Sequence, residues 1–585
     1  MKRKLQHYEP INISKKQKIS DYINLVTATE TKNYIIKDYI IDYFIEEKKN
    51  NKFIDNDKDT IINQKDNLFI AYICNKGIEF EQYIINYINK NIITVESVSP
   101  YINDTNIKIC LELMEKGVPI IHSVPFLDVK NKTKGVIDLI VRNDYVTKLI
   151  KNHPPVENKE SKFGDYHYVV IDIKYTTIEL KKDKIHVSNS AKFKCYKTQL
   201  NIYNDAIGNI QNFTPRYSYL LGLKYKNNSD IFHSFDKLGT VDFKIVDNFI
   251  IDETRKSIEW VRNVKNNFHK MKLDPPSIPE LYPNMNIDSG KWNSKKEELS
   301  KNISEITSIW NVTLANRNKA FSLGITSWKD SRCNSDVLGI TNKHKANIID
   351  SILDINRQDE HKILPKQIIN NVSNWKQQEN EMFVDFETLT DFNYTDNKII
   401  IFMIGVYWKN NNKWEYKSFT CNNISPDEEY RIINDFVDFL IINKHPKLWY
   451  WYADNKIWNS AVNRHLDKYI KDDNKEKQEY ICNRWNTLNW LDMSKIFNTE
   501  PVVIKDCFDF SLKNITKALN SHNLITYKLK SDCNNGMSAS IIALDVYKNS
   551  PDPLSNKVFK DLEKYNKFDV KILYKIIDYL RNNHT

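Results

Sequence analysis

Two pairs of ionisable residues, each separated by a single position, have the types and spacing needed for hydrolytic chemistry. Asp172 is followed by Lys174, and Asp385 is followed by Glu387. Both pairs lie in apolar runs that predict strands, where residues two apart project from the same face. A carboxylate beside an ammonium, or two adjacent carboxylates, can bind a divalent cation and activate water against a phosphodiester. We therefore expect two separate metal-dependent sites.

Further residues accompany the first pair. Asp138 lies in an earlier strand-like run, residues 135–141, and an antiparallel pairing of the two strands would bring its carboxylate to the Mg²⁺ held by Asp172. Glu81 lies in a helical run and could supply a third oxygen ligand. Lys174 could orient or deprotonate the attacking water. An isolated Asp-x-Lys pair is more typical of a solvated strand edge, so the predicted role depends on these companions.

Four short motifs follow one another within residues 70–225. They are Gly-x-x-Phe-Glu ending at Glu81, Gly-x-x-Asp ending at Asp138, Asp172-x-Lys174 and Gln199-x-x-x-Tyr203. The last two residues are one helical turn apart and could hold a phosphate or the lysine. In this order the motifs resemble the RecB-like branch of the PD-(D/E)xK nucleases. The resemblance implies that Lys174 is the catalytic lysine and that Gln199 and Tyr203 are the signature helix pair. It also implies three metal ligands, Glu81, Asp138 and Asp172.

The second pair is joined by two residues near the end of the chain. Asp385 and Glu387 could grip two metal ions about 3.5–4 Å apart, the separation suited to in-line displacement at phosphorus. Tyr565 and Asp569 are four positions apart at the start of a predicted amphipathic helix, residues 568–580, and share one side of it. Tyr565 could orient the attacking water, while Asp569 would complete the metal cage.

These residues resemble the DEDD exonucleases of the ribonuclease H-like fold, in the branch whose last motif is Tyr-x-x-x-Asp. The resemblance implies one more metal-binding acid, placed after a strand and near the start of a helix. Asp454 is the best candidate because it follows the aromatic run 449–452, which predicts a buried strand. A helix-capping role for Asp454 is an alternative, and Asp492 and Asp506 are further candidates for the acid.

Other segments extend the resemblance over nearly the whole chain. These segments are Asn33-Tyr34, Leu323-Gly324-Ile325, the run 510–515 and the Tyr-Asn-x-x-Asp ending. With the two motif sets, they resemble bacterial and large-DNA-virus proteins that fuse a RecB-like nuclease to a ribonuclease H-like exonuclease. The resemblance implies an α/β multidomain fold with a restriction-endonuclease-like α/β core, a helical connector and a ribonuclease H-like α/β domain.

The domain organisation follows from composition and punctuation. The length exceeds what one hydrophobic core usually serves, and a cluster of prolines near residue 275 marks a boundary. We expect four regions: a basic disordered tail over 1–20, a RecB-like PD-(D/E)xK nuclease domain over 21–265, a proline-containing linker and helical connector over 266–375, and a ribonuclease H-like DEDD exonuclease domain over 376–585.

Composition also limits the cofactors and partners. The 585 residues carry a net charge of +10, a mild basic excess compatible with nucleic acid, DNA in preference to RNA. The eight cysteines form no Cys-x-x-Cys pair, and the candidate ligands are hard oxygen atoms, so Mg²⁺ or Mn²⁺ is expected in place of zinc. No apolar stretch approaches the roughly 20 residues of a membrane span. We expect an intracellular protein without membrane contact, in the cytoplasm or nucleus of a cell or virus-infected host, or in a virion.

The predicted activity is hydrolysis of phosphodiester bonds in nucleic acid at two independent metal-dependent sites. Two alternatives belong to other classes. One is a nucleic-acid-binding scaffold in which one or both sites are inactive, and its sign would be missing ligands. The other is a proofreading-type exonuclease subunit, because the Tyr-x-x-x-Asp branch includes proofreading domains.

Overall fold

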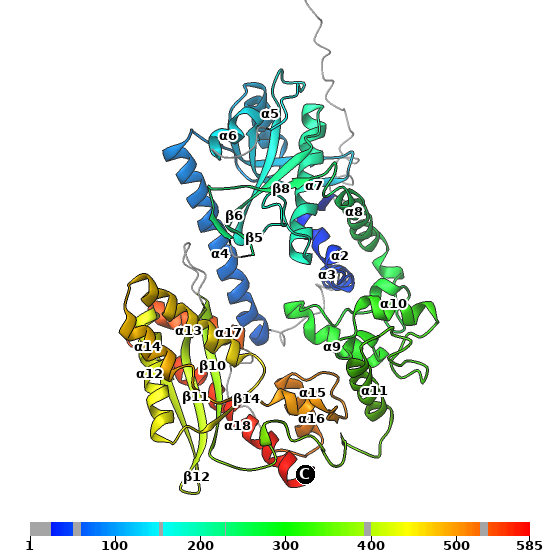
Figure 1. Ribbon diagram of the computed structural model, residues 1–585. Helices are drawn as coiled ribbons and strands as arrows, with labels where there is room; N and C mark the ends of the chain where they lie inside the picture. Colours follow the sequence, from blue (N-terminus) through cyan, green and yellow to red (C-terminus); the bar gives the residue numbers. More distant parts are fainter. Residues whose placement is uncertain (1–24, 51–59, 151–155, 229, 391–398, 527–535) are drawn as a thin grey trace, which may run out of the picture. The chain divides into compact units, whose positions relative to one another are not determined.

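The computed structural model describes residues 25–50, 60–150, 156–228, 230–390, 399–526 and 536–585. The predicted basic tail, residues 1–20, lies outside this part of the chain. The described residues group into two compact units, the first with residues 25–50, 60 and 70–299 and the second with residues 61–69 and 300–585 (Figure 1). Each unit holds a mixed β-sheet and several helices. The chain is therefore an α/β multidomain protein, as the sequence predicts.

The first unit is built on an eight-stranded mixed sheet in the order β2-β3-β4-β5-β6-β7, with β1 paired to β4 and β8 to β6. The strands are β1 (Val26–Thr27), β2 (Glu96–Ser97), β3 (Ile120–Asp128), β4 (Thr133–Arg142), β5 (Tyr168–Glu179), β6 (Tyr217–Asn227), β7 (Asp230–His233) and β8 (Gly239–Asp242). β3, β4 and β5 are antiparallel neighbours, whereas β5 and β6 are parallel and connect through α7 (Ala191–Gln211). This crossover lays α7 against the sheet.

Alternation along β5 decides which residues meet α7. Tyr168 and Val170 of β5 share one buried cluster with Phe193 and Leu200 of α7. Asp172 and Lys174 continue this alternation and so lie on the same face of β5. The other helices of the unit are α2 (Lys32–Ile35), α3 (Ile40–Asn50), α5 (Asp104–Glu115), α6 (Val146–Leu149) and α8 (Phe249–Asn267). The unit also holds residues 70–91 of α4 (Thr60–Asn91) and residues 293–299 of α9 (Asn293–Ile303).

The second unit is built on a five-stranded mixed sheet in the order β12-β11-β10-β13-β14. The strands are β10 (Glu381–Thr390), β11 (Ile399–Asn410), β12 (Lys413–Thr420), β13 (Lys447–Tyr450) and β14 (Trp490–Asp492). β10 lies in the centre, antiparallel to β11 and parallel to β13. A further antiparallel pair joins β9 (Ile363–Leu364) to β15 (Val503–Ile504).

Apolar residues cover both faces of this sheet. Val384 and Phe386 of β10 belong to one buried cluster, while Phe383 belongs to another that contains Leu573 and Ile576 of the last helix. Asp385 and Glu387 therefore lie on the Phe383 face, toward the last helix. The helices are α10 (Leu314–Ser322), α11 (Lys343–Arg357), α12 (Pro426–Ile442), α13 (Asp454–Lys471), α14 (Lys475–Arg484), α15 (Ser494–Thr499), α16 (Leu512–Ser521), α17 (Gly536–Asn549) and α18 (Lys557–Asn583).

The last helix is longer than the sequence predicts. α18 begins at Lys557 rather than at residue 568, because the Asn556 side chain caps it by accepting the backbone N–H of Val558. Its early turns bury Phe559 and Leu562. Tyr565 and Asp569 consequently lie inside a continuous helix, which fixes both side chains on one face.

The region predicted as a connector, residues 266–375, contains the boundary between the two units. Its second half packs into the second unit, where Ile349 and Ile352 of α11 share a buried cluster with Val503 of β15. α11 thus contributes to a core. Throughout the part of the chain that the structure describes, no helix combines the length and apolarity required to cross a membrane.

Two candidate acidic sites

The first candidate site lies where β4 and β5 run side by side. Their antiparallel pairing begins with Leu139 opposite Ile171. The preceding position of β4 and the following position of β5 carry Asp138 and Asp172, so the hairpin places these acids next to each other. Asp138 Oδ2 accepts a hydrogen bond from the backbone N–H of Ile173 at 2.7 Å. Two carboxylates from different strands thus meet, as the predicted strand pairing requires.

Asp172 and Lys174 form an ion pair on β5. Lys174 Nζ lies 2.7 Å from Asp172 Oδ2, and the Asp172 side chain is fully buried. Among the described residues, Asp172 Oδ1 has no hydrogen-bond partner. Burial lowers the pKa of Lys174, but the charges of Asp172 and Asp138 outweigh it and hold this pKa above its usual range. The ammonium therefore stays charged beside a buried carboxylate whose Oδ1 has no hydrogen-bond partner among the described residues.

Glu81 of α4 lies at the edge of this group. Burial, the charge of Asp172 and, more weakly, the charge of Glu81 raise the pKa of Asp138 well above its usual range. The Glu81 carboxylate is hydrogen bonded to His122 Nε2 of β3 at 2.8 Å. Among the described residues, the oxygen atoms of Glu81, Asp138 and Asp172 do not all lie within 4.8 Å of one another. The structure brings Asp138, Asp172 and Lys174 together and pairs Glu81 with His122.

The predicted helix pair lies on α7, above these acids. Gln199 Nε2 donates a hydrogen bond to the Tyr203 hydroxyl at 2.9 Å. Burial and the charges of Asp172 and Asp138 raise the pKa of Tyr203, so its hydroxyl lies within electrostatic reach of both acids. Tyr196, one turn before Gln199, is a neighbour that the sequence analysis missed: Lys174 Nζ lies 5.3 Å from the centre of its ring. Tyr196 precedes Gln199 by three positions, a spacing that places both on one face of a helix and could have identified Tyr196 from the sequence.

The second candidate site is centred on β10. One oxygen atom from each of Asp385, Glu387 and Asp569 lies within 4.8 Å of the other two, and this is the one such group among the described residues. A register shift between β10 and β11 follows Glu387 directly, and bulges of this kind re-aim side chains next to active sites. The structure thus brings three of the predicted metal ligands together from a strand and a distant helix.

Asp454 is the first residue of α13 and follows β13, as predicted. Ala453 occupies the cap position of this helix, so capping does not account for Asp454. Burial raises the pKa of Asp454, and the backbone N–H groups of Trp451 and Phe386 act in the opposite direction. Its charge is the largest electrostatic influence on Asp385 after burial. Asp454 therefore lies next to the group formed by Asp385, Glu387 and Asp569 without being one of its three members.

The two other candidates for this acid are engaged elsewhere. Asp492 accepts hydrogen bonds from the backbone N–H groups of Tyr452 at 3.1 Å and Ser494 at 3.0 Å. Asp506 lies 3.1 Å from His522 Nε2. Asp492 supports the turn that leads into α13, and Asp506 belongs to a separate surface pair.

Tyr565 and Asp569 face one another on α18. Burial raises the pKa of Asp569, and the Tyr565 hydroxyl nearby partly offsets this rise. Burial and the charges of Asp569 and Glu387 raise the pKa of Tyr565. The hydroxyl therefore keeps its proton at physiological pH and remains a donor beside the acids.

Asn566 is a site residue that the sequence analysis did not identify. Its side chain is fully buried, and its Nδ2 lies 3.0 Å from Asp385 Oδ2 and 3.4 Å from Glu387 Oε1. Its Oδ1 accepts a hydrogen bond from the Tyr416 hydroxyl at 3.1 Å. Gly405 of β11, opposite Asp385, leaves room for it, since a Cβ at Gly405 would lie 1.6 Å from Asn566 Oδ1. Asn566 thus holds the two strand acids toward one another.

Negative charge is crowded at this second site. Burial and the neighbouring carboxylates raise the pKa of Asp385 and of Glu387 well above their usual ranges. Burial raises the pKa of Asp454 and of Asp569 to about 7. The main opposing influences are hydrogen bonds from an amide, a hydroxyl and backbone N–H groups. Four carboxylates in this state can ionise together when a cation offsets their charge.

A search of protein-family models and a search of curated proteins found no match for this chain. What the two sites can do must therefore be inferred from their own geometry and charge.

Proposed function

We propose that the protein is a metal-dependent nuclease that hydrolyses phosphodiester bonds in nucleic acid, DNA in preference to RNA, at two separate sites. The observation that carries the proposal is the group formed by Asp385, Glu387 and Asp569, whose oxygen atoms lie within 4.8 Å of one another. Carboxylate oxygens at such spacing suit Mg²⁺ or Mn²⁺, the cations of phosphoryl chemistry.

We also infer the finer fold of each unit. The second unit would be a ribonuclease H-like domain of the DEDD type, which is supported by the chain order of its acids on a central strand, at a helix start and on the last helix. The first unit would be a restriction-endonuclease-like domain of the RecB-like branch, which is supported by the β4–β5 hairpin and the pair on α7. In this scheme the protein is a fusion of two nucleases.

The residues present fit divalent cations. At the second site Asp385, Glu387 and Asp569 would hold the metal, with Asp454 beside them. Burial raises the pKa of all three acids, and neighbouring carboxylates add to the rise at Asp385 and Glu387, so a cation would stabilise their ionised forms. At the first site Asp138 and Asp172 would hold it, since Asp172 Oδ1 is buried and lacks a partner among the described residues. When bound, such a cation lowers the pKa of water and offsets charge that develops on the phosphate.

The chain's own residues supply the remaining parts of the mechanism. Tyr565 stays protonated and can donate a hydrogen bond that orients the attacking water. Asn566 holds Asp385 and Glu387 in fixed directions through its amide. Lys174, charged and next to Asp172, can hold water or stabilise negative charge on the scissile phosphate.

The test is cleavage of end-labelled single- and double-stranded DNA, with an RNA control, in Mg²⁺ or Mn²⁺. Wild type would be compared with Asp138→Asn and Asp385→Asn, and with Asp104→Asn, an exposed acid of α5, as the matched control. We expect each site variant to lose a different part of the product pattern. Release of no product from any substrate by the wild type would refute the proposal and favour a nucleic-acid-binding scaffold.

A further inference from the structure

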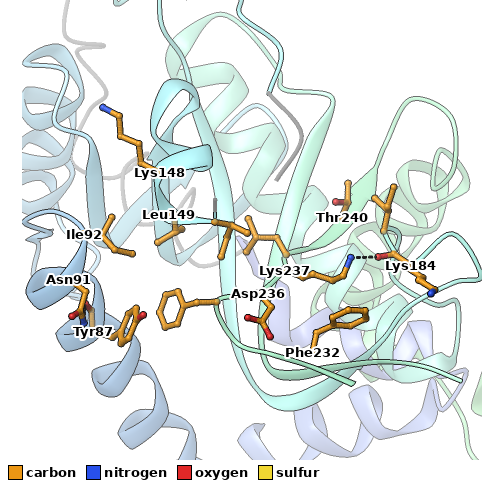
Figure 2. A pocket seen from close by; sticks show the side chains of 14 residues that line it. Tyr87, Asn91, Ile92, Lys148, Leu149, Lys184, Phe232, Asp236, Lys237 and Thr240 are labelled. Carbon is orange, nitrogen blue, oxygen red and sulfur yellow. Dashed lines mark hydrogen bonds between the residues drawn. The ribbon is translucent and has the colours of Figure 1, made fainter. Parts of the chain in front are cut away.

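A groove opens on the first unit beside the last turns of α4. Its volume is about 1040 Å³, and its lining includes Tyr87 of α4, Lys148 of α6, and Phe235 and Lys237 from the segment between β7 and β8 (Figure 2). Small-molecule pockets usually have volumes of about 300–1,000 Å³ and enclose their ligand. This groove is at the upper limit of that range and combines exposed rings with cations, so its shape suits part of an extended ligand.

A series of aromatic rings runs from β5 along α4 to the groove. Tyr175 of β5 contacts Phe80 of α4, with ring centres 5.7 Å apart. Along α4, Phe80 is followed by Tyr83 at 6.3 Å and Tyr83 by Tyr87 at 6.5 Å. Tyr87 then stacks on Phe235 at 4.1 Å. Because Tyr83 is 46% exposed and Tyr87 is 37% exposed, part of each ring can meet a ligand.

Positive charge exceeds negative charge in the groove. Lys148, Lys184 and Lys237 line it, against one lining carboxylate, Asp236, which accepts a backbone N–H at 2.7 Å. Lys184 also lies 2.6 Å from Asp230, but surface pairs of this kind are weak. Figure 2 shows Lys148 at one end of the groove and Lys184 with Lys237 at the other. The cations thus lie at separate ends of the groove.

We propose that this groove binds single-stranded nucleic acid, as the stretch of the substrate strand that lies beyond the first candidate site. The inference rests on the proposed nuclease function of that site. Backbone phosphates would meet Lys148 and Lys237, and a base would stack on the open face of Tyr87. Glu81 and Tyr87 are six residues apart on α4, about 9 Å along its axis, which corresponds to about three stacked nucleotides. One strand can therefore reach both places.

Two features favour a single strand over other polyanions. Stacking on Tyr87 requires the free face of a base, which a base-paired duplex does not offer along its length. Cations at separate ends of the groove suit a ligand whose negative charge repeats along a backbone. An acidic peptide has the charge but lacks flat bases for the rings.

The first experiment measures binding of a fluorescent oligothymidylate of about 12 nucleotides to the full chain in EDTA, so that metal-dependent cleavage does not interfere. Each phosphate contact on a single strand contributes about 0.7 to the salt dependence of log K. We expect Lys148→Ala/Lys237→Ala to reduce the slope of log K against log salt concentration by about 1.4. Lys148→Arg/Lys237→Arg keeps the charge and should keep the slope.

The matched control removes two exposed lysines of the same unit that do not line the groove. Lys108→Ala/Lys256→Ala has the same net charge as the groove variant and should bind as wild type does. Equal slopes for the groove variant and this control would refute the inference, since the charge effect would then be general. Displacement of the oligonucleotide by polyglutamate at equal concentration of charge would also refute it.

The second experiment tests stacking. Tyr87→Leu keeps an apolar contact with Phe235 but removes the aromatic face, so affinity for the oligothymidylate should fall on the order of tenfold. Affinity for an abasic strand of the same length should stay unchanged. An equal loss with both strands, or equally tight wild-type binding of a duplex, would refute single-strand stacking.

The outcomes separate this inference from the proposed function. If wild type cleaves nucleic acid while the groove variants bind and cleave as wild type does, the groove inference fails and the nuclease proposal stands. If the groove variants lose binding but wild type cleaves nothing, the groove is a nucleic-acid site and the nuclease proposal fails.

Discussion

The two candidate sites share a backbone design and differ in charge. Each places two functional residues two apart on a buried strand, Asp172 with Lys174 and Asp385 with Glu387. In each, a register shift follows the second residue. The first site sets an ammonium 2.7 Å from its buried carboxylate. At the second site the carboxylate of Glu387 takes the place of the ammonium, and the neutral amide of Asn566 bridges Asp385 and Glu387.

This difference shows how one residue changes the amount of positive charge that a site needs from a bound cation or from protons. At the first site the Lys174 ammonium offsets part of the negative charge of the acids, so the site needs less positive charge from a bound cation. At the second site burial and mutual repulsion raise the pKa values of the carboxylates, so the charge must be offset by protons or by a cation. We expect the second site to depend more steeply on metal, and the following predictions test that contrast.

The largest expected effect is at Lys174. Lys174→Met removes the internal cation, so cleavage by the first site should fall by about 10²–10⁴-fold, the range for a positioned acid–base group. The assay would use an Asp385→Asn background, in which the first site acts alone. Lys192→Met is the matched control, because Lys192 is hydrogen bonded to Thr176 on the same strand without contacting the acids. Equal losses in both variants would contradict a specific role for Lys174.

Next in size is the effect at Asn566. Asn566→Leu should weaken metal affinity or cleavage at the second site by about 10–100-fold, the usual cost of removing a group that orients metal ligands. Metal titration in an Asp138→Asn background measures it, and Asn583→Leu on the same helix is the control. An unchanged metal titration would show that the amide only fills space.

Two glycines allow the same change to be compared at both sites. A Cβ at Gly405 would lie 1.6 Å from Asn566 Oδ1, whereas a Cβ at Gly135 would lie 3.0 Å from the Phe126 ring. Gly405→Ala should therefore lower the free energy of unfolding by about 1–3 kcal/mol, as overpacking does, and Gly135→Ala by less. Urea unfolding of each variant measures the difference, and equal losses would contradict the tight packing of Asn566.

Much of the fold and part of each site can be predicted from sequence, for physical reasons that the sites illustrate. Strand alternation places Asp385 beside Glu387, and antiparallel pairing brings Asp138 to Asp172, because both depend on local backbone geometry. The pairing of Glu81 with His122 could not be predicted, because it depends on which side chain of a separate strand lies nearby. The role of Asn566 likewise depends on the space above Gly405, in a strand far away in sequence.

The smallest expected effect is a shift of stability with pH. The pKa of Asp454 and of Asp569 is about 7 in the folded chain, against about 3.9 for an unfolded aspartate. Between these values the folded chain binds more protons than the unfolded chain, so the free energy of unfolding falls as pH rises from 5 to 8. In EDTA the melting temperature should therefore drop by several degrees over this range. Asp454→Asn should flatten the dependence, because it removes one of the two titrating groups. Mg²⁺ at pH 8 should reverse the drop, because a cation stabilises the ionised, buried carboxylates. A melting temperature that rises with pH in EDTA would contradict the raised pKa values of Asp454 and Asp569 in the folded chain.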